Sequence, residues 1–135
     1  MSRSGYVDDC DEWALIRWRG AVASAIRGKR GQALLREMLV ALDAMPEKEL
    51  ISDELIQDGD VCALGVVGIA RGLDMAKVDP EEYEQVANLF GISVALVREI
   101  ESENDEGAFY GETPEQRWAR MRKWVVSKIA VGHAS

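Results

Sequence analysis

The sequence predicts an all-α fold, in which about six to seven helices form a compact single-domain helical bundle. Apolar residues recur at intervals of three and four along several stretches, which is the period of a helix. Two sets of helix-start residues, at 79–82 and 113–116, place proline at the first helical position. No segment alternates convincingly as a strand does, and 135 residues is the size of one domain.

The N-terminal third predicts two helices. The first starts among the acids at 8–12, which suit the positive end of a helix dipole, and its apolar stripe runs to Ile26. The glycines of RGKRG (27–31) predict a break. A second helix over 32–45 should end at Met45-Pro46, because the residue before a proline is pushed out of the helical region.

The stretch 46–60 is compatible with more than one local structure. Its apolar residues fit a short helix or a small β-hairpin near 49–57, and Asp58-Gly59 indicates a turn in either case. A short helix is expected after Asp60, closed by Gly72.

Two further helices are expected on either side of Gly91. Asp79-Pro80 predicts a helix that starts there and reaches Phe90. Ser93 is a suitable N-cap for the next helix, over 94–103.

The last helix has the clearest start. Thr113-Pro114-Glu115-Gln116 is a capping box with proline at the first position, and the helix should reach about Val131. Residues 1–8 and 132–135 are expected to be tails of the single domain 1–135.

The net charge of −8 hides an uneven distribution. Residues 1–40 hold seven bases and five acids, residues 41–115 hold four and nineteen, and residues 116–135 hold five bases and no acid. An asymmetry of this kind bears on partners rather than on fold. The alternative is a solubilised surface whose ends neutralise its middle.

The segment VANLFGISVALVREI (86–100) has the packing pattern of a helix-turn-helix. Ala87 is the small residue where two helices would touch, and Gly91 is free to adopt the positive φ of the turn. Residues 83–102 resemble the helix-turn-helix of phage repressors and related bacterial regulators. The alternative interpretation is a tight helix–helix corner within a bundle.

The resemblance implies that the exposed start of the second helix, with Ser93 and Arg98, enters the major groove of DNA. In a dimer, the DNA backbone would be contacted by Arg117, Arg120 and Lys123. However, the acids of ESENDE (101–106) follow at once, and carboxylates oppose the displacement of counterions on which DNA affinity depends.

No residue pattern indicates catalysis, a cofactor or a metal. Gly28-Lys29 lacks the remainder of the phosphate-binding loop pattern, and Cys10, Cys62 and His133 do not have zinc spacing. The sequence therefore predicts a protein without enzymatic activity. It has no apolar run of membrane-span length and no secretory leader pattern, so a cytoplasmic protein with two reduced thiols is expected.

Three strings carry a resemblance over residues 12–126: RWRGAVASAIRGKRGQALLREMLVALDAMPEKELI, DGDVCALGVVGIARG and ETPEQRWARMRKWV. They are similar to a group of small uncharacterised proteins encoded by phages and prophages. The resemblance implies a single-purpose binding protein in the cytoplasm of a bacterial host, and it assigns no site residues.

The leading functional hypothesis is a non-catalytic protein whose acidic middle, residues 79–106 in particular, engages a host protein that is basic or handles nucleic acid. The predicted contacts are Glu81, Glu82, Glu99, Glu101, Glu103, Asp105 and Glu106. The alternative is a helix-turn-helix transcriptional regulator that binds DNA as a homodimer. A third interpretation, an assembly protein, rests on the four tryptophans.

Overall fold

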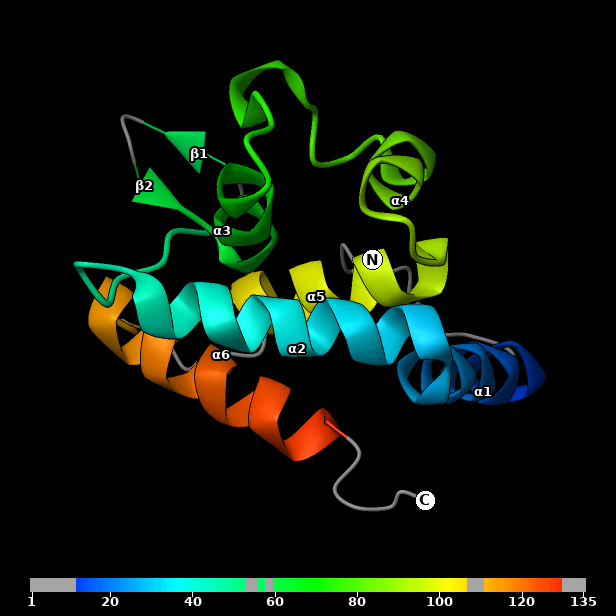
Figure 1. Ribbon diagram of the computed structural model, residues 1–135. Helices are drawn as coiled ribbons and strands as arrows, with labels where there is room; N and C mark the ends of the chain where they lie inside the picture. The colour runs from blue at the N-terminus through cyan, green and yellow to red at the C-terminus, as the bar shows by residue number, and fades with distance from the viewer. Residues whose placement is uncertain (1–11, 53–55, 58–59, 107–110, 130–135) are drawn as a thin grey trace.

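The fold is all-α, as the helical periodicity predicts. The computed structural model describes residues 12–52, 56–57, 60–106 and 111–129. Within these residues there are six α-helices, one 3-10 helix and a two-stranded ladder (Figure 1).

Helices α1 (Glu12–Arg27) and α2 (Lys29–Ala44) are separated by Gly28 alone. The predicted break over 27–31 is therefore wrong in extent, because α2 already begins at Lys29. Gly31 lies so close to α1 that a Cβ on it would stand 1.9 Å from the carbonyl oxygen of Ala25. Glycine at this position thus lets the two helices turn sharply against one another.

The hairpin lies later in the chain than expected. β1 (Ile56–Gln57) pairs antiparallel with β2 (Asp60–Val61). Residues 45–52, just after α2, contain neither helix nor strand, and the amide of Ile51 donates to the carbonyl of Val61 over 2.9 Å. α3 (Ala63–Ala70) and the 3-10 helix η1 (Met75–Lys77) follow.

α4 (Tyr83–Phe90) starts three residues later than Asp79-Pro80 predicts. The carboxylate of Asp79 accepts from the amide of Glu81 over 2.9 Å, and its carbonyl accepts from the amide of Glu82 over 3.1 Å. Asp79 therefore closes a turn before the helix instead of capping it.

The expected corner between α4 and α5 (Val94–Glu106) is present. Gly91 adopts a φ of 72°, the left-handed conformation that ends a helix without strain in glycine. The hydroxyl of Ser93 accepts from the amide of Leu96 over 3.2 Å, so Ser93 is the predicted N-cap.

α6 (Pro114–Lys128) begins with the predicted capping box. The Thr113 hydroxyl accepts from the Gln116 amide over 3.1 Å, and the Gln116 side chain accepts from the Thr113 amide over 2.9 Å. Val131 and the expected tails, residues 1–8 and 132–135, lie outside the described residues.

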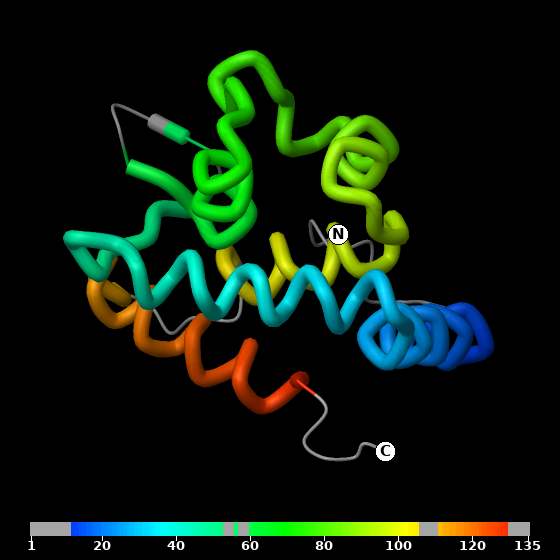
Figure 2. Tube along the Cα trace, in the orientation of Figure 1, coloured from blue at the N-terminus to red at the C-terminus, as the bar shows by residue number. Residues whose placement is uncertain are grey.

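α5 is the central helix of the bundle. It contacts α1, α3, α4 and α6, and Figure 2 shows it behind α2, with α3 and α4 above and α6 below. Leu96, Val97 and Ile100 are completely buried. Every described side chain of α5, from 94 to 105, is buried or half-buried, so this helix has no exposed face in the described structure.

Candidate functional site

The predicted acidic contacts do not gather on one surface. Glu81 and Glu82 are exposed in the turn before α4, which packs at the N-terminal end of α5. Glu103 and Asp105 are half-buried near the opposite end of that helix. Two of the seven predicted acids therefore lie near the N-terminal end of the central helix, and the other five lie within that helix between residues 99 and 106.

Glu101 is only 4% exposed, so its predicted role as a surface contact does not fit its position. Burial, and then the nearby charge of Glu99, raise the pKa of the half-buried Glu103, while Arg120 opposes this from 3.9 Å. The side chain of Glu106 lies outside the described part of the chain. The burial of Glu101 and the partial burial of Glu103 thus make these two acids less accessible to a partner than the sequence predicts.

The predicted DNA-reading residues are also engaged internally. Ser93 caps α5. The guanidinium of Arg98 lies 4.6 Å from the centre of the Tyr83 ring and 5.6 Å from that of Trp18. These contacts tie α5 to α4 and α1 and hold Arg98 against the rings.

Two of the predicted backbone contacts of DNA bind the C-terminal part of α5 instead. Arg120 donates to the carboxylate of Glu112 over 2.7 Å and to the carbonyl of Asn104 over 3.2 Å. Arg117 donates to the same carbonyl over 3.1 Å and lies 3.4 Å from Glu112, whose side chain is 1% exposed. Of the predicted set, Lys123 is exposed.

An apolar groove lies between the C-terminal end of α2 and α3. It encloses about 280 Å³ and is lined by Ala41, Ala44, Met45, Pro46, Val61, Val66, Ile69 and Ala70. All residues of α3 (ALGVVGIA) are apolar or glycine. Packing of one side of this helix in the core therefore leaves Ile69, on another side, 47% exposed. Val40, 70% exposed, lies one turn before Ala44 on the same face of α2.

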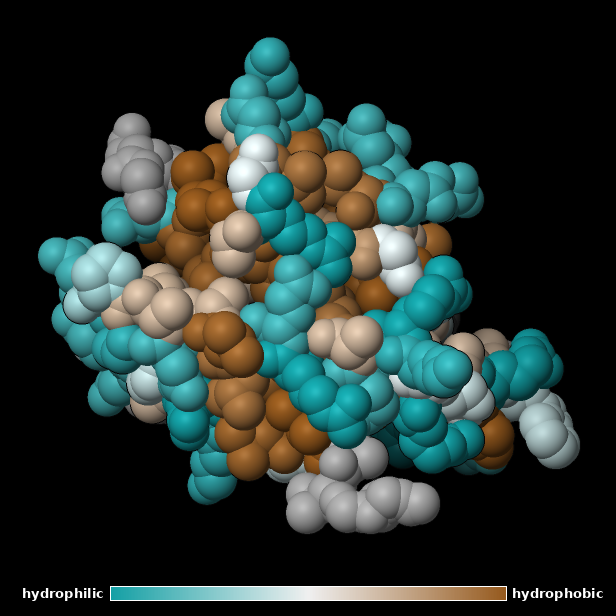
Figure 3. Space-filling view, viewed as in Figure 1, coloured by the Kyte–Doolittle hydropathy of each residue, from teal (hydrophilic) through white to brown (hydrophobic). Residues whose placement is uncertain are grey.

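The space-filling view shows how this apolar region reaches the surface. Hydrophobic side chains gather over α3, next to hydrophilic side chains along α2 (Figure 3). An ion pair joins the C-terminal end of α3 to α2. The guanidinium of Arg71, the residue after α3, donates to both carboxylate oxygens of Glu37 over 2.7 Å.

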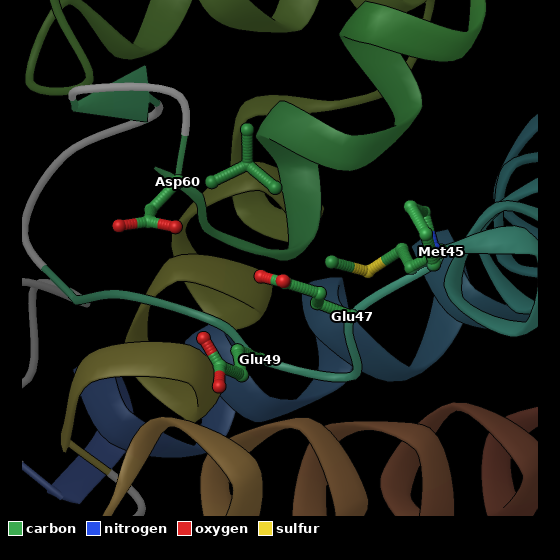
Figure 4. A pocket seen from close by; sticks show the side chains of 6 residues that line it. Met45, Glu47, Glu49 and Asp60 are labelled. Atoms are coloured by element: carbon green, nitrogen blue, oxygen red, sulfur yellow. The ribbon is translucent and has the colours of Figure 1, made fainter.

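A second hollow, of about 230 Å³, continues the groove and carries acidic side chains. It shares Met45, Pro46 and Val61 with the groove, and its remaining lining residues are Glu47, Glu49 and Asp60. Glu47 and Glu49 come from the segment after α2 and Asp60 from β2, and their carboxylates lie around the same space (Figure 4). The two hollows together are called the acid-rimmed groove below.

The rim concentrates negative charge. A hydrogen bond that the protonated Glu49 carboxyl donates to the Glu115 carboxylate raises the pKa of Glu49, and the charges of Glu115, Glu47 and Asp60 raise it further. The sequence from Glu47 to Asp60 holds six acids and one base, Lys48. Lys48 donates to the carbonyls of Asp43 and Met45 and lies over the Trp118 ring, so it is directed to α2 and α6. A bound cation would therefore reduce the electrostatic repulsion among the acids of this rim.

The segment that carries the rim is held by hydrogen bonds of its backbone groups with both backbone and side-chain partners. The amide of Leu50 donates to the carbonyl of Pro114 over 3.1 Å, and Arg117 donates to the carbonyl of Leu50 over 3.2 Å. The side-chain amide of Asn104 donates to the carbonyl of Ile51 over 2.8 Å, and its side-chain oxygen accepts from the backbone amide of Ala63 over 3.2 Å. The rim is therefore pre-organised before any ligand arrives.

Sequence reasoning missed both the groove and Asn104. Asn104 is 1% exposed, and its spacing of four and seven residues from Ile100 and Val97 places it on the buried face of α5. That spacing was the signal that could have identified it as a structural residue. For the groove, the signals were the apolar run ALGVVGIA and the acids that precede it.

The described ranges lack both a metal-binding cluster and a membrane-spanning helix. They contain no group of three or more His, Cys, Asp or Glu that could hold a metal ion. Nor does any helix there combine the length and apolar character that crossing a membrane requires.

The remaining question is whether similar proteins indicate a function. The chain matches no protein-family model, no curated protein and no solved structure, so the acid-rimmed groove and the chain's own residues are what bears on its function.

Proposed function

We propose that this chain is a non-catalytic binding protein that accepts a basic, amphipathic segment of a partner protein in the acid-rimmed groove. The observation that carries the proposal is the continuity of an apolar groove with three clustered carboxylates. Apolar side chains of the partner would fill the space beside Ile69, while its Lys or Arg residues would meet Glu47 and Asp60.

The proposal keeps the acidic block of residues 41–115 as the basis of binding but moves the contacts from 79–106 to the groove. The resemblance to phage-borne proteins supports a setting in the cytoplasm of a bacterial host. A host protein that handles nucleic acid would offer a suitable basic surface.

A direct binding measurement with designed peptides tests the proposal. The probes are a fluorescent helical peptide of Leu and Lys, its counterpart with Glu in place of Lys, and a scrambled Leu/Lys peptide of equal charge. Fluorescence anisotropy should show binding of the amphipathic basic peptide, at least tenfold weaker binding of the scrambled one, and none of the acidic one. Binding should weaken with salt, because the rim is solvent-accessible.

Matched variants locate the site. Glu47→Gln with Asp60→Asn, and separately Ile69→Ser, should each weaken binding about tenfold, the size of one lost anchor or charge contact. Glu81→Gln with Glu82→Gln removes two exposed acids outside the groove and should leave affinity unchanged. The reverse pattern would place binding at the turn before α4 and refute the groove as the site.

A further inference from the structure

α1 presents an exposed surface whose charge is opposite to that of the groove rim. Val22 is its buried residue, and the half-buried Leu15, Trp18, Ala25 and Ile26 lie on the same side. On the other side, at helical spacing, the exposed residues are Trp13, Ile16, Arg17, Gly20, Ser24 and Arg27. Lys29 and Arg30 extend the positive charge into the first turn of α2.

This outward face has the chemistry that the acid-rimmed groove requires. Ile16 is 57% exposed, Arg17 follows it directly, and Arg27 lies about three turns further along the same face, so apolar and basic groups share one face. Glu12 is the acid among residues 12–36, against six bases. The face is therefore a basic amphipathic segment within the chain itself.

The geometry prevents a molecule from filling its own groove with this face. α1 joins α2 at Gly28, whereas the groove lies at the other end of α2, beyond Ala41. A helix of 16 residues separates the two ends by roughly 24 Å. The groove can therefore receive α1 only from another molecule.

We propose that the outward face of α1 in one copy docks into the acid-rimmed groove of a second copy. The inference rests on the proposed function, since it uses the same groove, and it names the chain itself as an occupant. Ile16 enters the space beside Ile69, and Arg17 and Arg27 meet the carboxylates of Glu47 and Asp60. The two surfaces differ, so the contact is head-to-tail and produces rings where the rotation between copies closes and open chains where it does not.

Sedimentation velocity of the full chain at low salt, with two charge-reversal variants, tests the proposal. One variant carries Arg17→Glu and Arg27→Glu, and the other carries Glu47→Lys and Asp60→Lys. The wild type should exceed the monomer mass of 15.0 kDa increasingly with concentration. Each variant alone should associate at least tenfold more weakly, while an equimolar mixture should assemble again, because both opposite-charge pairings are restored in it.

An apolar variant and its control provide a second readout. Ile16→Ser should also weaken association, whereas Val126→Ser, at a 43% exposed position on α6, should not. Circular dichroism verifies the fold of each protein. Both Ile16 and Val126 are exposed, so this pair remains informative if a charge variant fails to fold.

Three outcomes would overturn the inference: a wild type that stays monomeric, a charge variant that assembles alone, or a mixture that does not assemble. A monomeric wild type that still binds the Leu/Lys peptide refutes self-docking and leaves the proposed function intact. If the chain assembles as expected, excess Leu/Lys peptide should dissociate the assembly, because both occupy one groove.

Discussion

The guanidinium of Arg98 lies 4.6 Å from the centre of the Tyr83 ring. This contact joins the two helices of the helix-turn-helix-like corner, and Trp18 adds a contact from α1 at 5.6 Å. The side chain that the sequence places at the base edges of DNA thus helps to hold three helices together.

Replacing Arg98 should affect stability. We expect Arg98→Ala to lower the free energy of unfolding by about 1–2 kcal/mol, through lost cation–π contact and lost packing of its stem. Urea denaturation measures this change. Lys123→Ala, at an exposed position on α6, is the control and should stay within about 0.5 kcal/mol of wild type. Unchanged stability of Arg98→Ala together with loss of a DNA gel shift would favour the regulator alternative.

Substitution by alanine should change stability in opposite directions at two helical glycines. At Gly31 a Cβ would meet the Ala25 carbonyl oxygen at 1.9 Å, and a backbone atom cannot swing aside, so Gly31→Ala should destabilise by about 3 kcal/mol. At Gly20 nothing lies within 4 Å, so Gly20→Ala should stabilise by about 0.5–1 kcal/mol through helix propensity. Thermal unfolding of the two variants beside the wild type decides both signs, and a stabilising Gly31→Ala would contradict the tight α1–α2 turn.

Glu112 should be the acid whose loss costs most. Its side chain is 1% exposed and contacts Arg117 and Arg120, so Glu112→Gln leaves two partly buried cations without their carboxylate. We expect a loss of about 3 kcal/mol in the free energy of unfolding. Glu47→Gln, at an exposed rim position, serves as the control and should be neutral. Equal effects of the two substitutions would show that the buried cluster carries no special stability.

Peptide binding at the groove should displace a proton from Glu49. Because Glu115 and neighbouring charges raise the pKa of Glu49, Glu49 keeps its proton at a higher pH than an ordinary glutamate. A cationic peptide favours the ionised form, so binding should release a proton, and affinity should fall as pH drops through the raised pKa. Isothermal titration calorimetry in two buffers of different ionisation enthalpy measures the release. Glu49→Gln should abolish it, and a persistent release in that variant would assign the proton to another group.

The same raised pKa fixes the sign of the effect on stability. The folded state holds the Glu49 proton at a pH where the unfolded chain has lost it. The Glu49 shift by itself therefore makes stability decline as pH rises through the interval between its ordinary and its raised pKa, whereas the lowered pKa of Glu115 makes stability decline as pH falls through that lowered value.

Local signals in the sequence predicted the parts of the fold that depend on short-range interactions. The Thr113 capping box, the Ser93 cap and the turn at Gly91 each need only a few neighbouring residues, and all three are present. The start at Asp79-Pro80 failed because an aspartate side chain can close a turn as readily as it caps a helix.

The candidate site depends on long-range packing, which the spacing of one segment does not reveal. The acidic block predicted a basic partner, but the burial of Glu101 follows from α5 lying at the centre of the bundle. The groove joins residues of α2 to residues of α3 and β2. Their proximity is a property of the assembled helices.

The central position of α5 also predicts different rates of amide hydrogen exchange at the centre and at the periphery of the molecule. Its amide protons are shielded by four surrounding helices, so their exchange with solvent should require opening of the whole domain. The exposed half of α1 and the groove rim lie at the periphery, where smaller local openings suffice. Amide exchange at both surfaces should therefore be faster than exchange in α5.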